Sequence, residues 1–255
     1  LQTMQQCAEL VENTGDAEHY EKQAKQLSEL IIPTFWNAEK GAMMHHTKGG
    51  QLQDEVTRYA NMFAVLYDIL DESQRQSVLK NVLQNDSVMK ITTPYMRFYE
   101  LEALCALGQQ KQVMDEMRSY WGGMLAQGAT TFWETYDPKE GYPKRLAMYG
   151  NRYGKSLCHA WGASPVYLLG KYYLGVRPTK PGYAEWECRP CLGDLKWMKG
   201  DVPTPHGNIH IEMTRKQIII DSKGCGPGKL IIGQKEVMVN PDQRIVVSLR
   251  SLHLR

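Results

Sequence analysis

The sequence lacks the features that mark membrane proteins and nucleic-acid-binding proteins. Its 30 basic and 28 acidic side chains leave a formal net charge of +2, too small an excess to attract a polyanion. No apolar run reaches the roughly 20 residues that a membrane-spanning helix needs. The sequence opens at Leu1, already in a helical pattern and without a signal peptide, which predicts a fragment or a processed piece. We therefore expect neither nucleic acid nor a membrane as a partner.

Cysteine pairs of the kind that hold zinc are also missing. The six cysteines are scattered, and only Cys188 and Cys191 have CxxC spacing, with no second pair to complete a zinc set. Free thiols are the expectation. They are compatible with a reducing compartment without establishing one, so the localisation stays open.

Motifs for phosphate binding, serine catalysis and metal binding are absent or incomplete. The segment from Lys223 to Leu230 resembles a phosphate loop, but Leu230 stands where Ser or Thr must reach magnesium. No G-x-S-x-G occurs. His45 and His46 are neighbours on a segment expected to be extended, so their side chains should point to opposite faces and share no ion. We predict no cofactor and no metal.

Helical periodicity dominates the first 175 residues, where apolar side chains recur at helical spacing in seven segments. Asp16 is the expected cap of the second helix, and the seventh is expected from about Tyr153 to Leu174. Long loops at 37–51, 84–93 and 128–152 follow every second helix. This rhythm predicts helical hairpins whose long loops gather on one rim. Seven helices would form about half of a ring of twelve.

The pattern changes to a period of two near residue 176. Prolines crowd the region after Pro178, and Ile209, Ile211 and Met213 then alternate with polar residues. Short β-branched runs continue to the end of the chain, separated by turn residues. We predict an α+β protein with two domains, a helical one over 1–175 and a small antiparallel β-sandwich over 176–255.

The candidate catalytic residue lies in the segment Gly128-Ala-Thr-Thr-Phe-Trp-Glu134. The helix before it ends at Gly128, so Glu134 is predicted to lie on a loop or short strand, directly after Trp133. A carboxylate beside an aromatic ring can face sugar carbons and water together. The alternative is an ordinary, partly exposed loop glutamate beside core aromatics.

A second segment, from Tyr153 to Pro165, carries His159 and Trp161 near the start of the predicted seventh helix. A pocket with a carboxylate, a histidine and the rings of Trp133 and Trp161 suits sugar recognition. Apolar ring faces take the C–H surfaces, and polar groups take the hydroxyls. The alternative for His159 is a core histidine bonded to a backbone carbonyl.

Together these segments resemble the paired motifs of bacterial α-L-rhamnosidases. The resemblance rests on Gly128–Glu134 and on Ser156-Leu-Cys-His-Ala-Trp-Gly-Ala-Ser-Pro-Val-Tyr-Leu168. The segments Gly175-Val-Arg-Pro178 and Lys199-Gly-Asp-Val-Pro-Thr-Pro205 resemble that family's passage into its C-terminal β domain. The resemblance to this family implies an α/α six-hairpin (toroid) barrel. It also implies inverting hydrolysis of a glycoside or oligosaccharide that ends in rhamnose. By motif position, Glu134 would be the general base and His159 would hold the sugar.

The family's general acid lies in an acidic, arginine-containing motif that this sequence lacks. Asp54, Glu55 and Glu100 are candidates, although none lies in a matching motif. We expect a fragment that omits the acid, is inactive alone and self-associates through exposed apolar helix faces. Two alternatives stay open. One is a non-catalytic carbohydrate-binding or scaffold protein, and the other is a different α/α-barrel glycosidase or a polysaccharide lyase.

Overall fold

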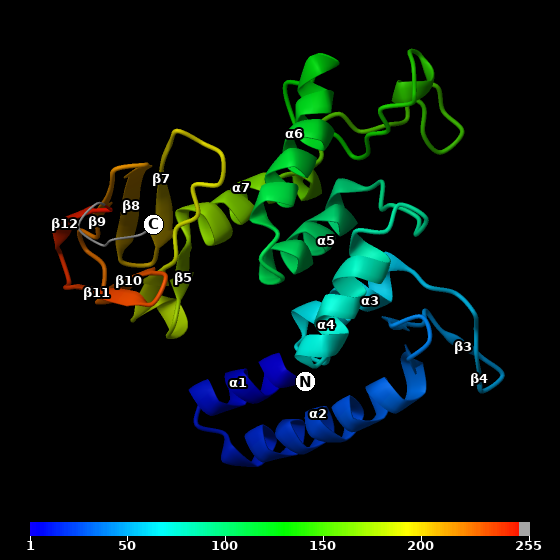
Figure 1. Ribbon diagram of the computed structural model, residues 1–255, viewed down its shortest axis with the longest axis horizontal. Coiled ribbons are helices and arrows are strands. Elements are labelled where there is room, and N and C mark those ends of the chain that lie inside the picture. The colour runs from blue at the N-terminus through cyan, green and yellow to red at the C-terminus, as the bar shows by residue number, and fades with distance from the viewer. Residues whose placement is uncertain (250–255) are drawn as a thin grey trace. The chain divides into compact units, whose positions relative to one another are not determined.

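The computed structural model describes residues 1–249 and divides into two compact units. The N-terminal unit comprises Leu1–Ile91 and Tyr99–Leu107. The C-terminal unit comprises Thr92–Phe98 and the chain from Gly108 onward. Helix α5 (Pro94–Ala106), labelled in Figure 1, belongs to both units. Its first residues fall in the second unit. Within residues 1–249, no helix combines the length and apolar character needed to cross a membrane.

The N-terminal unit is built from helical segments joined by short two-stranded sheets. Its helices are α1 (Gln2–Leu10), α2 (Thr14–Phe35), α3 (Arg58–Leu66) and α4 (Glu72–Val78), which continues as a π-helical turn over Leu79–Leu83. Its strands are β1 (Trp36–Asn37), β2 (Ala42–Met43), β3 (Thr47–Lys48) and β4 (Gln51–Leu52). The first four predicted helices are therefore confirmed.

Helix α2 differs from expectation at its cap. Its N-cap is Asn13, whose side-chain oxygen accepts the backbone N–H of Asp16 at 3.2 Å, so the prediction of Asp16 as the cap is wrong. Asn13 stands just before the first helical residue, where a side chain can reach the free N–H groups of the first turn. No residue of α2 is buried within this chain, and Leu27 on its apolar face is 52% exposed.

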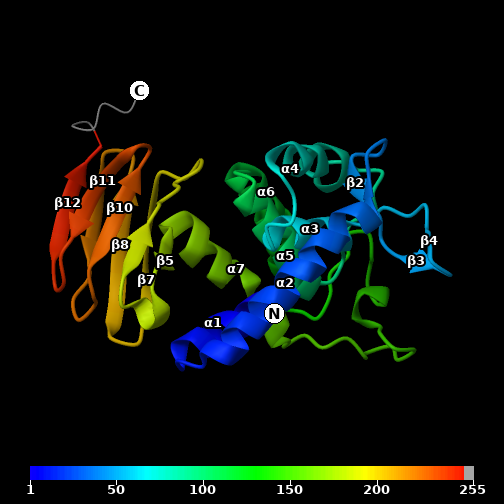
Figure 2. The ribbon, with the colours of Figure 1, turned by 90° about the horizontal axis from the view of Figure 1, so that it is seen from below.

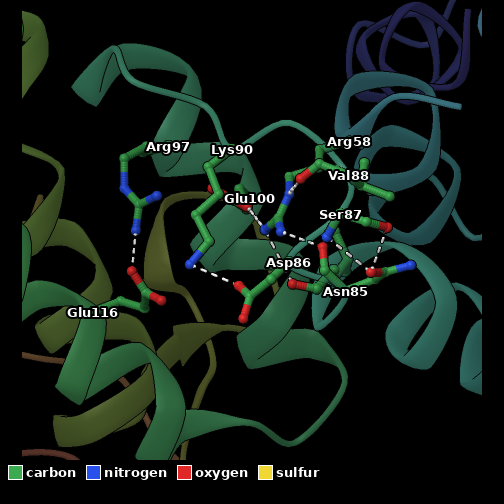
Figure 3. Close-up of polar contacts among 10 residues, drawn as sticks. Arg58, Asn85, Asp86, Ser87, Val88, Lys90, Arg97, Glu100 and Glu116 are labelled. Carbon is green, nitrogen blue, oxygen red and sulfur yellow. Dashed lines mark hydrogen bonds and ion pairs between the residues drawn. The ribbon is translucent and has the colours of Figure 1, made fainter. Parts of the chain in front are cut away.

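A buried arginine ties the N-terminal unit together (Figure 3). Arg58, at the start of α3, forms an ion pair with Glu100 of α5, and both side chains are almost fully buried. Its guanidinium also donates to the carbonyl oxygens of Leu83 at 3.0 Å and Asn85 at 3.1 Å. One side chain thus satisfies the carbonyl groups left free where the π-helical turn ends.

The C-terminal unit begins with helix α6 (Gln110–Ala126) and a long loop that leads to α7 (Ser164–Leu168). Helix α7 continues as a π-helical turn over Leu169–Leu174. The predicted seventh helix from Tyr153 is wrong for its first half, since only a 3-10 turn at Ala160–Gly162 precedes α7. Gly154 and Gly162 weaken helix formation there, and Pro165 suits a first helical turn.

Two four-stranded sheets complete the C-terminal unit (Figure 2). One has the order β12-β9-β8-β7, and the other has the order β11-β10-β6-β5. The strands are β5 (Val176–Pro178), β6 (Trp186–Cys188), β7 (Trp197–Thr204), β8 (Gly207–Thr214), β9 (Gln217–Asp221), β10 (Gly228–Ile232), β11 (Lys235–Val239) and β12 (Arg244–Ser248). In β8, Ile209, Ile211 and Met213 are buried while their neighbours are not, which confirms the period of two.

The prediction of a purely antiparallel domain is wrong in one place. Strands β6 and β10 pair in parallel, from Gly228 opposite Trp186 to Leu230 opposite Cys188. The chain between them passes through β7, β8 and β9 of the other sheet, and only such a long connection lets two strands run in the same direction. All other strand pairs in the described chain are antiparallel.

Candidate functional site

The candidate site is built from two loop segments of the C-terminal unit that bond along their backbones. The N–H of Glu134 donates to the Ser156 carbonyl at 2.9 Å, and the N–H of His159 donates to the Phe132 carbonyl at 2.8 Å. The hydroxyl of Thr131 also donates to the Leu157 carbonyl. Neither segment is a regular strand, but these bonds hold 131–134 beside 156–159. The predicted loop position of Glu134 is confirmed.

The Glu134 carboxylate is held at both oxygens. The Tyr149 hydroxyl donates to Oε1 at 2.7 Å, and the Ser156 backbone N–H donates to Oε2 at 3.0 Å. The side chain is buried, with 5% of the residue exposed, so it is not the partly exposed glutamate of the alternative interpretation. Each carboxylate oxygen offers about two lone-pair sites, so each keeps one for a further donor such as water.

The surroundings of Glu134 favour its charged form. The backbone N–H of Ser156 lowers the pKa of this carboxyl most, and the Tyr149 hydroxyl, His159 and Lys155 lower it further. The hydrogen bond from the Tyr149 hydroxyl to Glu134 also raises the pKa of Tyr149, because it holds the phenol proton against the carboxylate. A carboxylate ionised throughout the neutral range can accept a proton from water. It is poorly suited to donating one.

Removing the Tyr149 hydroxyl tests this electrostatic arrangement. Tyr149→Phe deletes one of the two hydrogen bonds that stabilise the charged form, so the pKa of Glu134 rises toward its ordinary value. A base must be deprotonated to act, so activity that depends on Glu134 should be lost at a higher pH than in the unsubstituted protein. The measurement is the acidic limb of kcat/KM against pH in the longer protein. An unmoved limb would contradict this role for Tyr149.

The predicted sugar-binding residues fall into two environments. The rings of His159 and Trp161 lie together, with centroids 4.1 Å apart, and Trp161 stacks on Tyr95 at 5.3 Å. Trp161 is 42% exposed. Trp133 is buried, with its ring 6.5 Å from that of Tyr136. The structure therefore groups His159 with Trp161 and places Trp133 in the core.

The loop that carries His159 and Trp161 is held in place by contacts at Gly162. Trp121 of α6 donates its indole N–H to the Gly162 carbonyl at 2.8 Å in a buried hydrogen bond. A Cβ added at Gly162 would lie 2.9 Å from Cβ of Phe132, so only glycine permits this close approach. His159 lies just before the 3-10 turn with an extended backbone, so the prediction that it is helical is wrong. Its side chain is half-buried, which does not fit the alternative of a core histidine.

The three carboxylates considered as acid partners lie in the N-terminal unit. Glu100 is buried in its ion pair with Arg58, and Asp54 is exposed and paired with Lys40. Glu55 lies beside His46, with Oε2 3.4 Å from Nδ1. The Arg58 guanidinium occupies the Glu100 carboxylate inside the N-terminal unit, which argues against Glu100 as the acid.

The structure corrects the expectation for His45 and His46. Their rings lie edge to face with centroids 5.4 Å apart, and one ligand atom from each of His45, His46 and Glu55 lies within 4.8 Å of the others. The two histidines do not point to opposite faces, because regular strand pairing is interrupted at both residues.

Sequence reasoning missed Tyr149, Tyr95 and the backbone N–H of Ser156. Tyr149 has a positive φ of 53° next to Gly150, in a turn closed by Met148 and Asn151, and no residue pattern points to that geometry. Tyr95 reaches Trp161 from the start of α5, far away in the sequence. A backbone donor such as Ser156 carries no sequence signal at all.

Comparison with known families identifies the class of protein. The family model described as the bacterial alpha-L-rhamnosidase 6 hairpin glycosidase domain matches residues 1–173. The model for the bacterial alpha-L-rhamnosidase C-terminal domain matches residues 175–221. These matches define a six-hairpin glycosidase domain followed by a C-terminal domain. The chain belongs to the bacterial α-L-rhamnosidase family, as the paired motifs around Glu134 and His159 predicted.

Solved structures agree with the family assignment. The GH78 family rhamnosidase of Bacillus sp. GL1 is 29% identical, with a TM-score of 0.66 over 85% of this chain and 22% of its own. A rhamnosidase from Klebsiella oxytoca with rhamnose bound is 25% identical, with a TM-score of 0.50 over 61% of this chain and 29% of its own. The α-L-rhamnosidase of Aspergillus terreus, at 16% identity, shares the fold with a TM-score of 0.77 over 96% of this chain and 29% of its own. No curated protein sequence matches.

The chain therefore spans less than a third of the length of each of these solved relatives. Its own residues supply one held carboxylate and an exposed aromatic group.

Proposed function

We propose that a longer protein containing this chain removes terminal α-L-rhamnose from glycosides or oligosaccharides by inverting hydrolysis, with Glu134 as the general base. The observation that carries the proposal is the Glu134 carboxylate, buried and held at both oxygens in the loop of the family motif. The Klebsiella relative was solved with rhamnose bound, which supports rhamnose as the sugar.

In the proposed mechanism, Glu134 activates a water molecule. The carboxylate accepts a proton as the water oxygen attacks the anomeric carbon, on the face opposite the leaving group. A carboxylic acid on the other side, roughly 6.5–9.5 Å away, protonates the departing oxygen. Asp54 and Glu100 form ion pairs with Lys40 and Arg58, and Glu55 lies beside His46, which supports an acid supplied from outside this chain.

We also propose that the chain contains two domains with different roles. Residues 1–175 would form half of an α/α six-hairpin toroid, and residues 176–255 a β-sandwich that supports it without catalytic residues. The absence of any buried residue along α2 supports a missing packing partner for its apolar face. The same exposed face supports self-association of the isolated chain. The two family models meet between residues 173 and 175, which supports the boundary.

The sugar ring is proposed to lie against Trp161, with His159 holding a hydroxyl and Trp133 supporting the pocket from the core. His159→Ala should raise KM for an aryl rhamnoside and lower kcat/KM by about 10-fold or more, since hydrogen bonds to a bound sugar typically contribute 1–3 kcal/mol. His206→Ala, an exposed histidine outside the motif, is the matched control and should change little. Unchanged rhamnose affinity of His159→Ala by calorimetry would refute the contact.

The test of the proposed function is hydrolysis of p-nitrophenyl α-L-rhamnoside by the longer protein, with the product followed by NMR. We expect β-L-rhamnose as the first product, followed by mutarotation. Rhamnose binding without turnover would favour a non-catalytic carbohydrate-binding protein. Cleavage of another sugar, or an unsaturated product, would favour a different glycosidase or a lyase.

A further inference from the structure

A second cluster of chemically active side chains lies in the hairpin of the N-terminal unit, within residues 42–57. Strands β3 and β4 pair Thr47 with Leu52, and a further bridge joins Met44 to Val56. Between these two pairs, two residues on one strand (45 and 46) face three on the other (53 to 55). This is the geometry of a β-bulge, in which an extra residue breaks the alternation of side chains and re-aims them.

The bulge is held by backbone hydrogen bonds. The N–H of His45 donates to the Glu55 carbonyl at 2.8 Å, and the N–H of Gln53 donates to the His46 carbonyl at 3.0 Å. These bonds fix the main chain on both sides of the cluster. The side chains of His45, His46 and Glu55 therefore converge because the backbone places them together.

The spacing within the cluster suits a small divalent ion. Ligand atoms bound to zinc at about 2.0–2.2 Å in a tetrahedron stand about 3.3–3.6 Å apart. His46 Nδ1 and Glu55 Oε2 already lie 3.4 Å apart, and the three ligand atoms lie within 4.8 Å of one another. Rotation of exposed side chains can close the remaining distance. Two imidazoles and one carboxylate leave a fourth position for water or another donor.

His45 also has a partner that orients its ring. Thr57 occupies the N-cap position of α3, yet its hydroxyl makes no cap hydrogen bond and lies 3.0 Å from His45 Nδ1. In the tautomer whose Nδ1–H donates to this oxygen, Nε2 carries the free lone pair. Histidine ligands of metals commonly use their second nitrogen in this way, and the outer hydrogen bond fixes the ring.

From this geometry we propose that His45, His46 and Glu55 form a site for Zn²⁺ or a similar borderline transition-metal ion. Imidazole and carboxylate together favour such ions over magnesium or calcium, which prefer oxygen ligands alone. The bound ion would join the two strands at the bulge. The proposal is independent of the glycosidase reaction, since Glu134 and its partners take no part in it.

The test is a titration of the whole chain with ZnCl₂ by calorimetry, in a background where the exposed thiols are removed by Cys7→Ser and Cys158→Ser. We expect one Zn²⁺ per chain. His46→Ala and Glu55→Gln should each weaken binding by at least 10-fold, and Thr57→Val should weaken it by about 10–100-fold through the orientation of His45. His19→Ala, at another exposed histidine of the same unit, should bind like the background protein.

Cobalt provides an independent readout of the ligands. Co²⁺ bound by nitrogen and oxygen donors gives visible absorption without the charge-transfer bands of cobalt–thiolate bonds, and His46→Ala should remove the signal. The proposal is overturned by the absence of saturable Zn²⁺ binding in the background protein. It is equally overturned if His46→Ala and His19→Ala bind with the same affinity, or if cobalt shows thiolate ligation.

Discussion

Glu134→Gln is expected to lower kcat of the longer enzyme by about two orders of magnitude or more. The amide keeps the shape of the carboxylate but cannot accept a proton from the attacking water, and general base catalysis typically contributes a factor of 10²–10⁴. The backbone N–H of Ser156 and the Tyr149 hydroxyl can still donate to an amide oxygen, although only one of the two original acceptors remains. The measurement is steady-state hydrolysis of an aryl α-L-rhamnoside.

Leaving-group dependence separates a base from an acid in the same experiment. p-Nitrophenolate departs without much help from an acid, so loss of an acid would harm hydrolysis of an alkyl rhamnoside far more than that of the nitrophenyl substrate. Loss of the base should harm both to a similar degree. Glu185→Gln changes a half-buried glutamate paired with Lys180. This variant is the matched control and should stay within a few-fold of the unsubstituted enzyme. Near-normal turnover by Glu134→Gln would refute the assignment.

The sequence was most informative where chemistry and periodicity are local. The loop position of Glu134 follows from a helix that ends before it, and the alternation in β8 follows from the spacing of its isoleucines. It was least informative where a backbone departs from its regular form. The seventh helix was extended too far toward its N-terminus, because apolar spacing continues through a segment that Gly154 and Gly162 keep irregular.

Contacts between residues that are distant in the sequence could not be predicted either, because they too depend on irregular backbone. His45 and His46 were assigned to opposite faces from strand geometry alone, and one extra residue on the paired strand reverses that result. Tyr149 meets Glu134 through a turn with an unusual backbone angle. The residue types in the candidate site follow from the sequence, whereas the hydrogen bonds that set its electrostatics depend on how the loops fold.

The largest effect on stability is expected from Arg58→Ala, which should lower the free energy of unfolding by about 3–5 kcal/mol. The substitution leaves the Glu100 carboxylate buried without its arginine and removes the donors to the Leu83 and Asn85 carbonyls. Most proteins have only about 5–15 kcal/mol to lose, so the N-terminal unit should unfold at much lower urea concentration. The measurement is urea unfolding of this chain followed by far-UV circular dichroism.

Two further variants separate the loss of the charge pair with Glu100 from the loss of the hydrogen bonds to the backbone carbonyl groups. Lys90→Ala removes an exposed pair with Asp86 in the same unit, and exposed pairs of this kind contribute little to stability (Figure 3). Arg58→Met combined with Glu100→Leu removes both buried charges and should recover part of the loss, because apolar side chains often replace a buried ion pair without cost. Full recovery is not expected, since the carbonyl groups of Leu83 and Asn85 still lack their donor. If Arg58→Ala costs no more than Lys90→Ala, the buried pair is not what holds α3 to α5.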